Sequence, residues 1–127
     1  MDWIDDTVAV GDWFDGFLAE RRRHEGVDLV IDSRILFTRN IIPRRRLPLV
    51  DVLVRARDQL VEISRHKPKV LIYCNRGMDR SPFVAMLYLS KRHGMSYQDA
   101  YELVRSKRQL TAFHWDWVEM MRESGRS

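Results

Sequence analysis

Short apolar runs alternate along this chain with longer stretches in which apolar residues recur at helical spacing. The runs predict strands at residues 8–10, 27–31 and 70–73, and a weaker strand at residues 40–42. The first run indicates a short edge strand that Gly11 ends. The run at 70–73 is continuous and apolar, so we expect that strand to be central and buried.

Helical spacing predicts the remaining elements. A helix over residues 13–23 follows Asp12, which can cap it, and carries Phe14, Phe17 and Leu18 as its apolar face. Four further helices are predicted over residues 49–65, from Ser81-Pro82 to Gly94, over 97–106 behind a capping pair of Ser96 and Asp99, and from Thr111 or Ala112 onward.

Strands alternate with helices first, and helices dominate afterwards. That order predicts an α/β fold with a central, mainly parallel sheet flanked by helices. The 127 residues suffice for one hydrophobic core and are too few for two, so we expect residues 1–127 to form a single domain. Met86, Met95 and the aromatic residues at helical spacing are interpreted as parts of that core.

The cysteine and histidine content limits the kinds of disulfide and metal site that this chain can form, and its hydropathy limits its relation to membranes. Cys74 is the only cysteine, which excludes an internal disulfide and a zinc site of several thiolates. The four histidines show no metal-ligand spacing, so we expect no metal and no cofactor. No apolar run reaches membrane-spanning length, and the first residues are acidic where a secretory signal is basic. These features favour a soluble, cytoplasmic protein.

The chain is basic, with a net charge of +4, and most of its positive charge is arginine. Arginine forms bidentate pairs with phosphate and carboxylate, which suits anionic ligands. Composition alone favours the plainer interpretation of an arginine-rich solvated surface.

The segment after the strand at 70–73 carries the candidate chemistry. Cys74 and Arg80 are separated by five residues, between a buried strand and a helix start that presents backbone N–H groups to an anion. A thiolate there is a nucleophile of lowered pKa, and the arginine fork holds phosphate oxygens. Gly77 permits a tight turn, and Ser81 can donate to the sulfur. The predicted phosphate-binding residues are Asn75, Arg76, Gly77, Met78, Asp79 and Arg80.

This Cys-x5-Arg-Ser pattern resembles the signature of the protein tyrosine phosphatase superfamily, specifically the small dual-specificity phosphatases. Residues 4–12 resemble the opening strand of that family, 27–33 its next strand, and 100–108 the helix after the signature helix. The resemblance implies a phosphomonoesterase that forms a phosphocysteine on Cys74 and acts on phosphorylated proteins or other anionic phosphomonoesters. The implied catalytic residues are Cys74, Arg80, Asp79 and Ser81.

Two features of the sequence depart from the family pattern. Tyr73 stands where the family usually has a histidine that supports the thiolate, and the loop at 43–48 lacks the usual acidic aspartate. Asp79 is the first candidate for the general acid, because Gly-x-Asp-Arg resembles the loops of myotubularin-type and Sac-type lipid phosphatases. Its alternative role is to pair with an arginine or cap the helix. Asp51 and Asp32 are the other candidates, and Asp32 is more simply interpreted as a salt-bridge partner of Arg34.

Several functions stay open at this point. The chain is either an active phosphatase or a catalytically impaired phosphate-binding module, and phosphoinositides or RNA 5′ phosphates are alternative ligands. A rhodanese-type sulfurtransferase also uses a cysteine loop, but the Arg-Ser pair argues against it. Because the family places the loop at 43–48 beside the active site, Arg44, Arg45 and Arg46 are interpreted as a rim that attracts polyanions, with a solvated loop as the alternative. The oligomeric state is left open.

Overall fold

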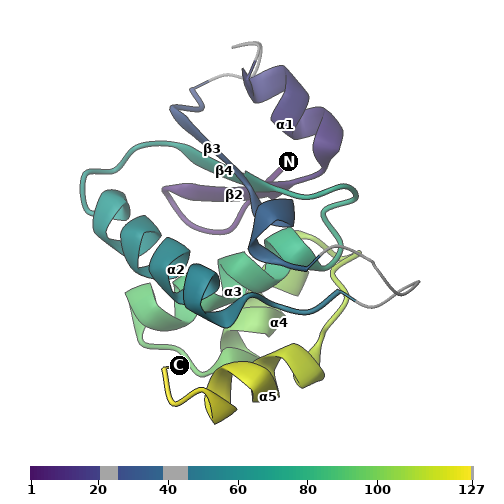
Figure 1. Ribbon diagram of the computed structural model, residues 1–127. Coiled ribbons are helices and arrows are strands. Elements are labelled where there is room, and N and C mark those ends of the chain that lie inside the picture. The colour runs from purple at the N-terminus through teal and green to yellow at the C-terminus, as the bar shows by residue number, and fades with distance from the viewer. Residues whose placement is uncertain (21–25, 39–45, 127) are drawn as a thin grey trace.

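A four-stranded sheet in the order β1-β2-β4-β3 forms the middle of the fold in this computed structural model, which describes residues 1–20, 26–38 and 46–126 (Figure 1). The strands are β1 (Asp2–Trp3), β2 (Val8–Gly11), β3 (Leu29–Asp32) and β4 (Val70–Tyr73). Strand β1 is antiparallel to β2, and the other two pairs are parallel. The predicted α/β fold with a mainly parallel sheet is therefore confirmed.

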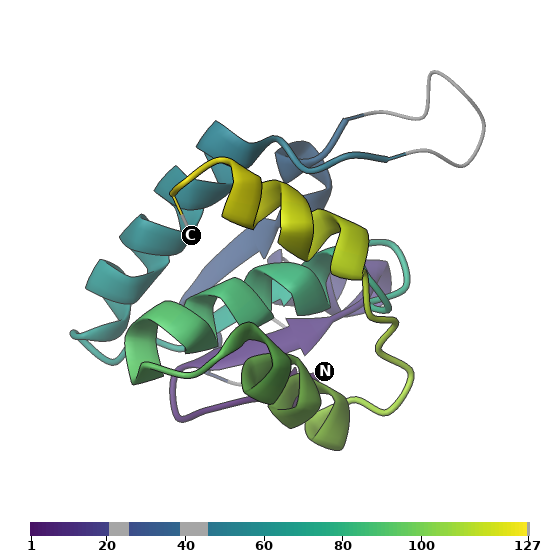
Figure 2. The ribbon, with the colours of Figure 1, turned by 90° about the horizontal axis from the view of Figure 1, so that it is seen from below.

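Helices cover both faces of this sheet. Helix α1 lies on one face, and the other helices lie on the opposite face, in front of the strands in the view from below (Figures 1 and 2). The helical elements are α1 (Trp13–Glu20), the short 3-10 helix η1 (Ser33–Leu36), α2 (Val50–Ser64), α3 (Arg80–His93), α4 (Tyr97–Lys107) and α5 (Trp115–Glu123). None of the helices within the described residues is long and apolar enough to cross a membrane.

The core divides according to the side-chain alternation of the strands. Val10 and Ile72 join the larger cluster with α2, α3, α4 and α5, whereas Ala9 and Leu71 join a smaller cluster with α1. Strands β2 and β4 are buried on both faces, which explains their uninterrupted apolar sequences. The prediction that the strand at 70–73 is central is confirmed.

The predicted apolar face of α1 is wrong. Phe14 and Phe17 are 56% and 39% exposed, and the helix instead buries Gly16 and Ala19. A Cβ at Gly16 would lie 2.6 Å from the ring of Tyr73, so the helix approaches the sheet through its small residues. Close packing against an aromatic ring on the sheet has overridden the helical pattern of large apolar residues.

Other predicted elements differ from those in the structure. Residues 8–10 were expected at an edge, but β2 lies between β1 and β4, because β1 adds an outer strand. The last helix begins at Trp115 rather than at 111 or 112, since the Ala112 N–H donates to the carbonyl of Met78 instead of entering a helix. The strand expected at 40–42 lies outside the described residues, as do Arg44 and Arg45.

The three parallel strands end at one edge of the sheet. Gly11 pairs with Tyr73, and Tyr73 pairs with Asp32, as the last residues of β2, β4 and β3. Ligand sites of parallel sheets form at this carboxyl edge. The register therefore brings the loop after β4 next to the segments that follow β2 and β3.

Candidate active site

The loop between β4 and α3, residues 74–79, is held from its outer side by its carbonyl groups. The carbonyl of Asn75 accepts from the Trp13 N–H at 3.1 Å, and that of Met78 accepts from the Ala112 N–H at 2.6 Å. Arg108 donates to the two carbonyls between them, to that of Arg76 at 3.1 Å and to that of Gly77 at 2.7 Å. Four consecutive carbonyls thus point away from the centre of the loop.

The N–H groups of the loop face the other way. In a trans peptide, the C=O of one residue and the N–H of the next point in opposite directions. The outward carbonyls of residues 75–78 therefore turn the N–H groups of residues 76–79 inward, and no hydrogen bond to another described residue occupies them. A ring of free N–H groups before a helix is an anion-binding cradle.

Gly77 allows this loop to form. Its φ angle is +64°, and a Cβ there would lie 2.5 Å from the Arg108 guanidinium and 2.7 Å from the Gly11 carbonyl oxygen. Both the left-handed backbone and the lack of space exclude a side chain. The predicted need for glycine at this position agrees with the geometry.

Cys74 is fully buried at the start of the loop. Its Sγ lies 3.3 Å from Ser81 Oγ, which in turn donates to the Gly11 carbonyl at 3.3 Å. Because a hydroxyl carries one proton, Ser81 can redirect it to the sulfur when Cys74 is a thiolate. The two atoms lie within hydrogen-bond distance, and donation from Ser81 to the thiolate stays a prediction.

Arg80 stands at the other end of the loop with a side chain that is only 6% exposed. Its Nε is buried without a hydrogen-bond partner among the described residues. Burial and the nearby Arg46 lower the pKa of Arg80, while the proximity of Cys74 opposes the shift. The nearest carboxylate oxygen, Asp79 Oδ1, lies 3.7 Å from Nε, beyond hydrogen-bond distance, and a buried donor without a hydrogen bond is rare, so a bound anion would complete this position.

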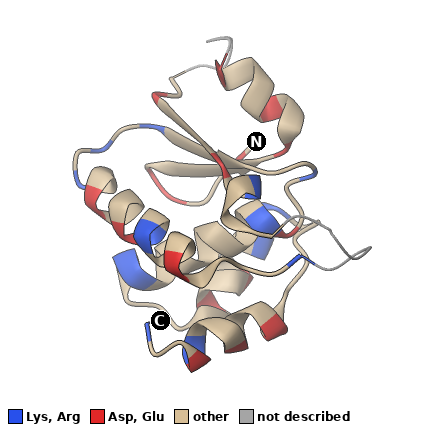
Figure 3. Cartoon of the chain, viewed as in Figure 1, with Lys and Arg blue, Asp and Glu red and all other residues tan. Residues whose placement is uncertain are grey.

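Two cavities meet at Arg46 and Arg80, and Figure 3 shows basic segments where η1 and the start of α3 come together. The first cavity, of about 410 Å³, is lined by Arg46, Asn75, Arg76, Met78, Asp79, Arg80 and Ala112. The second, of about 670 Å³, is lined by Asp32, Arg34, Ile35, Phe37, Thr38, Arg46 and Arg80. The loop therefore opens onto a polar, largely basic space.

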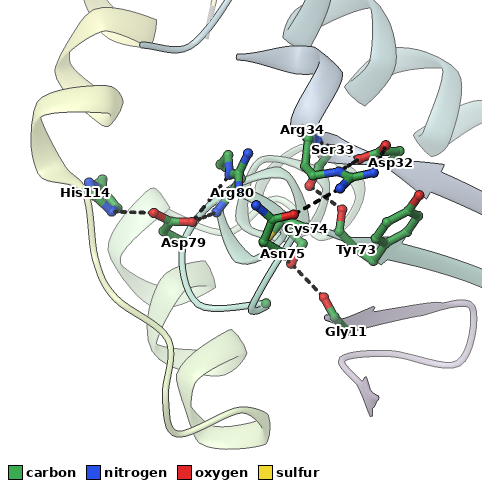
Figure 4. A network of polar contacts seen from close by, with 12 residues as sticks. Gly11, Asp32, Ser33, Arg34, Tyr73, Cys74, Asn75, Asp79, Arg80 and His114 are labelled. Carbon is green, nitrogen blue, oxygen red and sulfur yellow. Dashed lines mark hydrogen bonds and ion pairs between the residues drawn. The ribbon is translucent and has the colours of Figure 1, made fainter. Parts of the chain in front are cut away.

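Asp79 lies between Arg80 and His114 (Figure 4). Its Oδ1 accepts from the Arg80 N–H at 2.7 Å and caps α3, while its Oδ2 lies 3.6 Å from His114 Nε2. Burial alone would raise the pKa of Asp79, but the nearby His114 imidazole and the hydrogen bond from the Arg80 N–H outweigh it, so that the pKa is lowered. The capping role is confirmed, and the role of general acid stays a prediction.

The other two candidate acids have partners of their own. Asp32 forms a bidentate ion pair with Arg34 at 2.8 Å, which confirms the salt-bridge interpretation, and Arg34 also donates to Asn75 Oδ1 at 3.0 Å. Asp51 lies in the first turn of α2, is 78% exposed and pairs with Arg126. Asp51 lines neither of the two cavities.

Tyr73 connects the sheet to α1. Its ring packs against Gly16 within the cluster on the α1 face, and the Arg34 guanidinium lies 5.5 Å from the ring centre. Its hydroxyl lies 3.5 Å from Glu20 Oε1, and its carbonyl accepts from Ser33 Oγ at 2.7 Å. The residue that replaces the family's usual histidine thus anchors the neighbouring elements.

Sequence reasoning missed Arg108 and His114, and it named Arg34 only as a partner of Asp32. Arg108 lies just after α4, is almost fully buried, and also pairs with Asp2 at 2.9 Å. Its contact with Gly77 spans 31 positions, and no local pattern signals such a contact. Within the described residues, no group of three His, Cys, Asp or Glu side chains could hold a metal ion.

Comparison with known proteins agrees with this geometry. A sequence profile described as dual specificity phosphatase, catalytic domain, matches residues 44–126. Dual specificity protein phosphatase 1B of Arabidopsis thaliana is 51% identical over 39 residues, which are 31% of this chain and 23% of that protein. Protein-tyrosine-phosphatase IBR5 of the same plant is 23% identical over 94% of this chain and 49% of that protein.

Solved structures share the fold. Human DUSP28 matches with a TM-score of 0.75 and 17% identity over 99% of this chain and 98% of that chain. PTPMT1 matches with a TM-score of 0.75 and 20% identity over 96% of this chain and 91% of that chain. At these identities the likeness concerns the fold alone.

The fold, the cysteine loop and the profile match define the class: this chain belongs to the dual-specificity phosphatase catalytic-domain family. It spans 23% and 49% of the length of the two curated relatives described above.

Proposed function

We propose that this chain is a cysteine-dependent phosphomonoesterase that acts on phosphorylated proteins. The observation that carries the proposal is the loop at 74–79, which begins with Cys74 directly after β4 and combines inward N–H groups with a buried Arg80 Nε that has no hydrogen-bond partner among the described residues. The names of the relatives, all phosphatases, support the same activity. A lone reduced thiol suits the cytoplasm, where we place the reaction.

The proposed reaction has two steps. In the first, Cys74 Sγ attacks phosphorus, the S–P bond forms, and the leaving oxygen departs with a proton from an acid, for which Asp79 is the candidate. The loop N–H groups and Arg80 hold the three other oxygens. In the second, water attacks phosphorus and gives its proton back to the acid. The S–P bond then breaks, with Ser81 donating to the departing thiolate.

Substrate breadth follows from the shape of the site. The cavities beside Arg80 are open and lined mainly by polar and basic side chains. An accessible, basic site accepts phosphate on more than one kind of residue. We therefore propose phosphotyrosine together with phosphoserine or phosphothreonine, in keeping with the dual-specificity family.

The decisive experiment compares the native chain with Cys74→Ser. We expect the native chain to hydrolyse para-nitrophenyl phosphate and phosphopeptides without added metal. The variant should lose this activity and still bind tungstate or phosphate, because the loop amides remain. Hydrolysis by Cys74→Ser within about tenfold of the native rate would overturn the mechanism. Anion binding by the native chain without any turnover would instead favour the binding module.

A further inference from the structure

The imidazole of His114 is held in a fixed position beside the loop. Its ring stacks on the indole of Trp117, with 3.7 Å between ring centres and an angle of 9° between planes. Its backbone N–H donates to the Tyr101 hydroxyl at 3.3 Å. A stacked ring on an anchored backbone has little rotational freedom, so His114 presents its two nitrogens in defined directions.

Those nitrogens face two carboxylates. Nε2 lies 3.6 Å from Asp79 Oδ2, and Nδ1 lies 3.8 Å from Asp116 Oδ1. Arg80 lies on the other side of Asp79, with its Nε 3.7 Å from Asp79 Oδ1. From α4, the hydroxyl of Tyr101 is the titratable group near this pair. His114 therefore lies between an aspartate of the loop and an aspartate of α5.

Asp79 by itself is poorly suited to donate a proton. Because its pKa is lowered below the ordinary aspartate range of about 4, its carboxylate is ionised at neutral pH. An ionised carboxylate has no proton for the leaving oxygen. Histidine is the side chain whose ordinary titration lies near neutral pH, and one contacts this carboxylate directly.

We propose that His114 is a positioning residue that acts through Asp79, as the store of the proton that the leaving group receives. The inference rests on the proposed function and deepens it. When the P–O bond breaks, Asp79 passes a proton to the leaving oxygen and takes one from the His114 imidazolium. Asp79 ends as a carboxylate and His114 as a neutral ring. In the second step, the proton of the attacking water returns through Asp79 to His114.

This arrangement supplies a proton source in place of the aspartate that the family usually carries in the loop at 43–48. The segment at 111–114 runs along the phosphate loop, where the Ala112 N–H donates to the carbonyl of Met78. That contact brings His114 to the same side of the loop as Asp79 (Figure 4). The proton source is thus assembled from the loop and the start of α5.

The test is His114→Gln, with His93→Gln as the matched control. Glutamine can still donate a hydrogen bond to Asp79, but it cannot store a proton. His93 is the last residue of α3, roughly 20 Å along that helix from Arg80 at about 1.5 Å per residue, and it pairs with Asp5. The measurement is kcat/KM as a function of pH for two substrates. Phenyl phosphate has a poor leaving group, and para-nitrophenyl phosphate has a good one.

We expect His114→Gln to slow the hydrolysis of phenyl phosphate by about 10²-fold at neutral pH, as the loss of general acid catalysis predicts. Hydrolysis of para-nitrophenyl phosphate should slow only slightly. In the plot of kcat/KM for phenyl phosphate against pH, the fall on the alkaline side should move to lower pH, because Asp79 alone then carries the proton. His93→Gln should match the native chain. Only a proton store predicts both the leaving-group dependence and the shift of the fall on the alkaline side.

Two results would overturn the inference. One is an unchanged fall on the alkaline side in His114→Gln, and the other is an equal loss on both substrates, which is the behaviour of a purely structural residue. Both presuppose Cys74-dependent hydrolysis of para-nitrophenyl phosphate by the native chain. If that hydrolysis is absent, the proposed function fails first, so the two failures are distinguishable.

Discussion

Arg108 Nε donates a hydrogen bond of 2.7 Å to the carbonyl oxygen of Gly77. The same guanidinium reaches the carbonyl of Arg76 and the carboxylate of Asp2. Hydrogen bonds from charged donors are roughly twice as strong as neutral ones. A buried arginine behind the loop therefore fixes the direction of its peptides and leaves the N–H groups free for phosphate.

Replacing Arg108 with methionine tests this support. Methionine keeps much of the side-chain volume but offers no donors, so two loop carbonyls lose their partners. Each buried polar group left without a partner costs about 1–3 kcal/mol. We expect a lower melting temperature and at least about a tenfold loss in phosphate affinity, since tenfold corresponds to about 1.4 kcal/mol. Lys107→Met, an exposed neighbour, is the control, and equal behaviour of the two variants would contradict the role of Arg108.

Arg80→Lys should be nearly as damaging as Arg80→Ala. Lysine carries the charge but lacks the planar fork that holds two phosphate oxygens. The measurement is kcat/KM on para-nitrophenyl phosphate, together with phosphate inhibition. Near-native activity of the lysine variant would show that Arg80 does not clamp the phosphate.

Asp79→Asn should separate the candidate acids. We expect strong slowing of substrates with poor leaving groups, within the range of about 10² to 10⁴-fold for general acid catalysis, and little effect with good ones. Asp51→Asn is the control, because Asp51 pairs with Arg126 and lines neither cavity beside Arg80. Leaving-group dependence in Asp51→Asn or Asp32→Asn, but not in Asp79→Asn, would reassign the acid.

Arg46→Ala should weaken the binding of multiply phosphorylated peptides more than that of para-nitrophenyl phosphate. Arg46 lines both cavities that meet at Arg80, so it can contact anionic groups beyond the scissile phosphate. The difference should shrink as salt rises, because the Debye length falls from about 10 Å at 0.1 M to about 3 Å at 1 M. Titrations at low and high salt provide the measurement. Equal losses on both substrates would favour the interpretation of a solvated loop.

Asp5→Asn should lower stability in a pH-dependent way. The carboxylate of Asp5 accepts from Tyr88, from His93 and from the N–H groups of Thr7 and Val8. Burial alone would raise the pKa of Asp5, but these hydrogen bonds outweigh it and lower the pKa. Its stabilisation is therefore present above the unfolded pKa of about 4 and is lost as pH falls through the folded value.

Denaturant midpoints across pH check this expectation for Asp5. The loss of unfolding free energy caused by Asp5→Asn should be constant from neutral pH down to about 4. It should shrink in stronger acid, where the native carboxyl is also protonated. Asp6→Asn, at an exposed neighbouring carboxylate, is the control. A deficit that is the same at every pH would mean that the charge of Asp5 contributes nothing.

The sequence predicted what depends on short-range patterns. The strand at 70–73 is apolar without a break, Gly94 ends α3, and Ser96 caps α4, and each signal lies within a few residues of its effect. The conformation of the loop at 74–79 was predictable for the same reason, since its strand, glycine and helix start are contiguous.

The rest depends on contacts between distant segments. The exposed face of α1 was unpredictable because it follows from the ring of Tyr73 against Gly16, far along the chain. The partners of the loop, Arg108 and His114, were missed because an isolated arginine or histidine has no pattern until the fold brings it to residues 76–79.

The attachment of the loop carbonyls to Trp13, Arg108 and Ala112 has a consequence for cooperativity. Segments near both ends of the described chain hold one short loop, so the loop cannot keep its shape when either segment unfolds. The long-range contacts also place completion of the loop late in folding, after the distant segments have met. Loss of phosphate binding should therefore coincide with global unfolding.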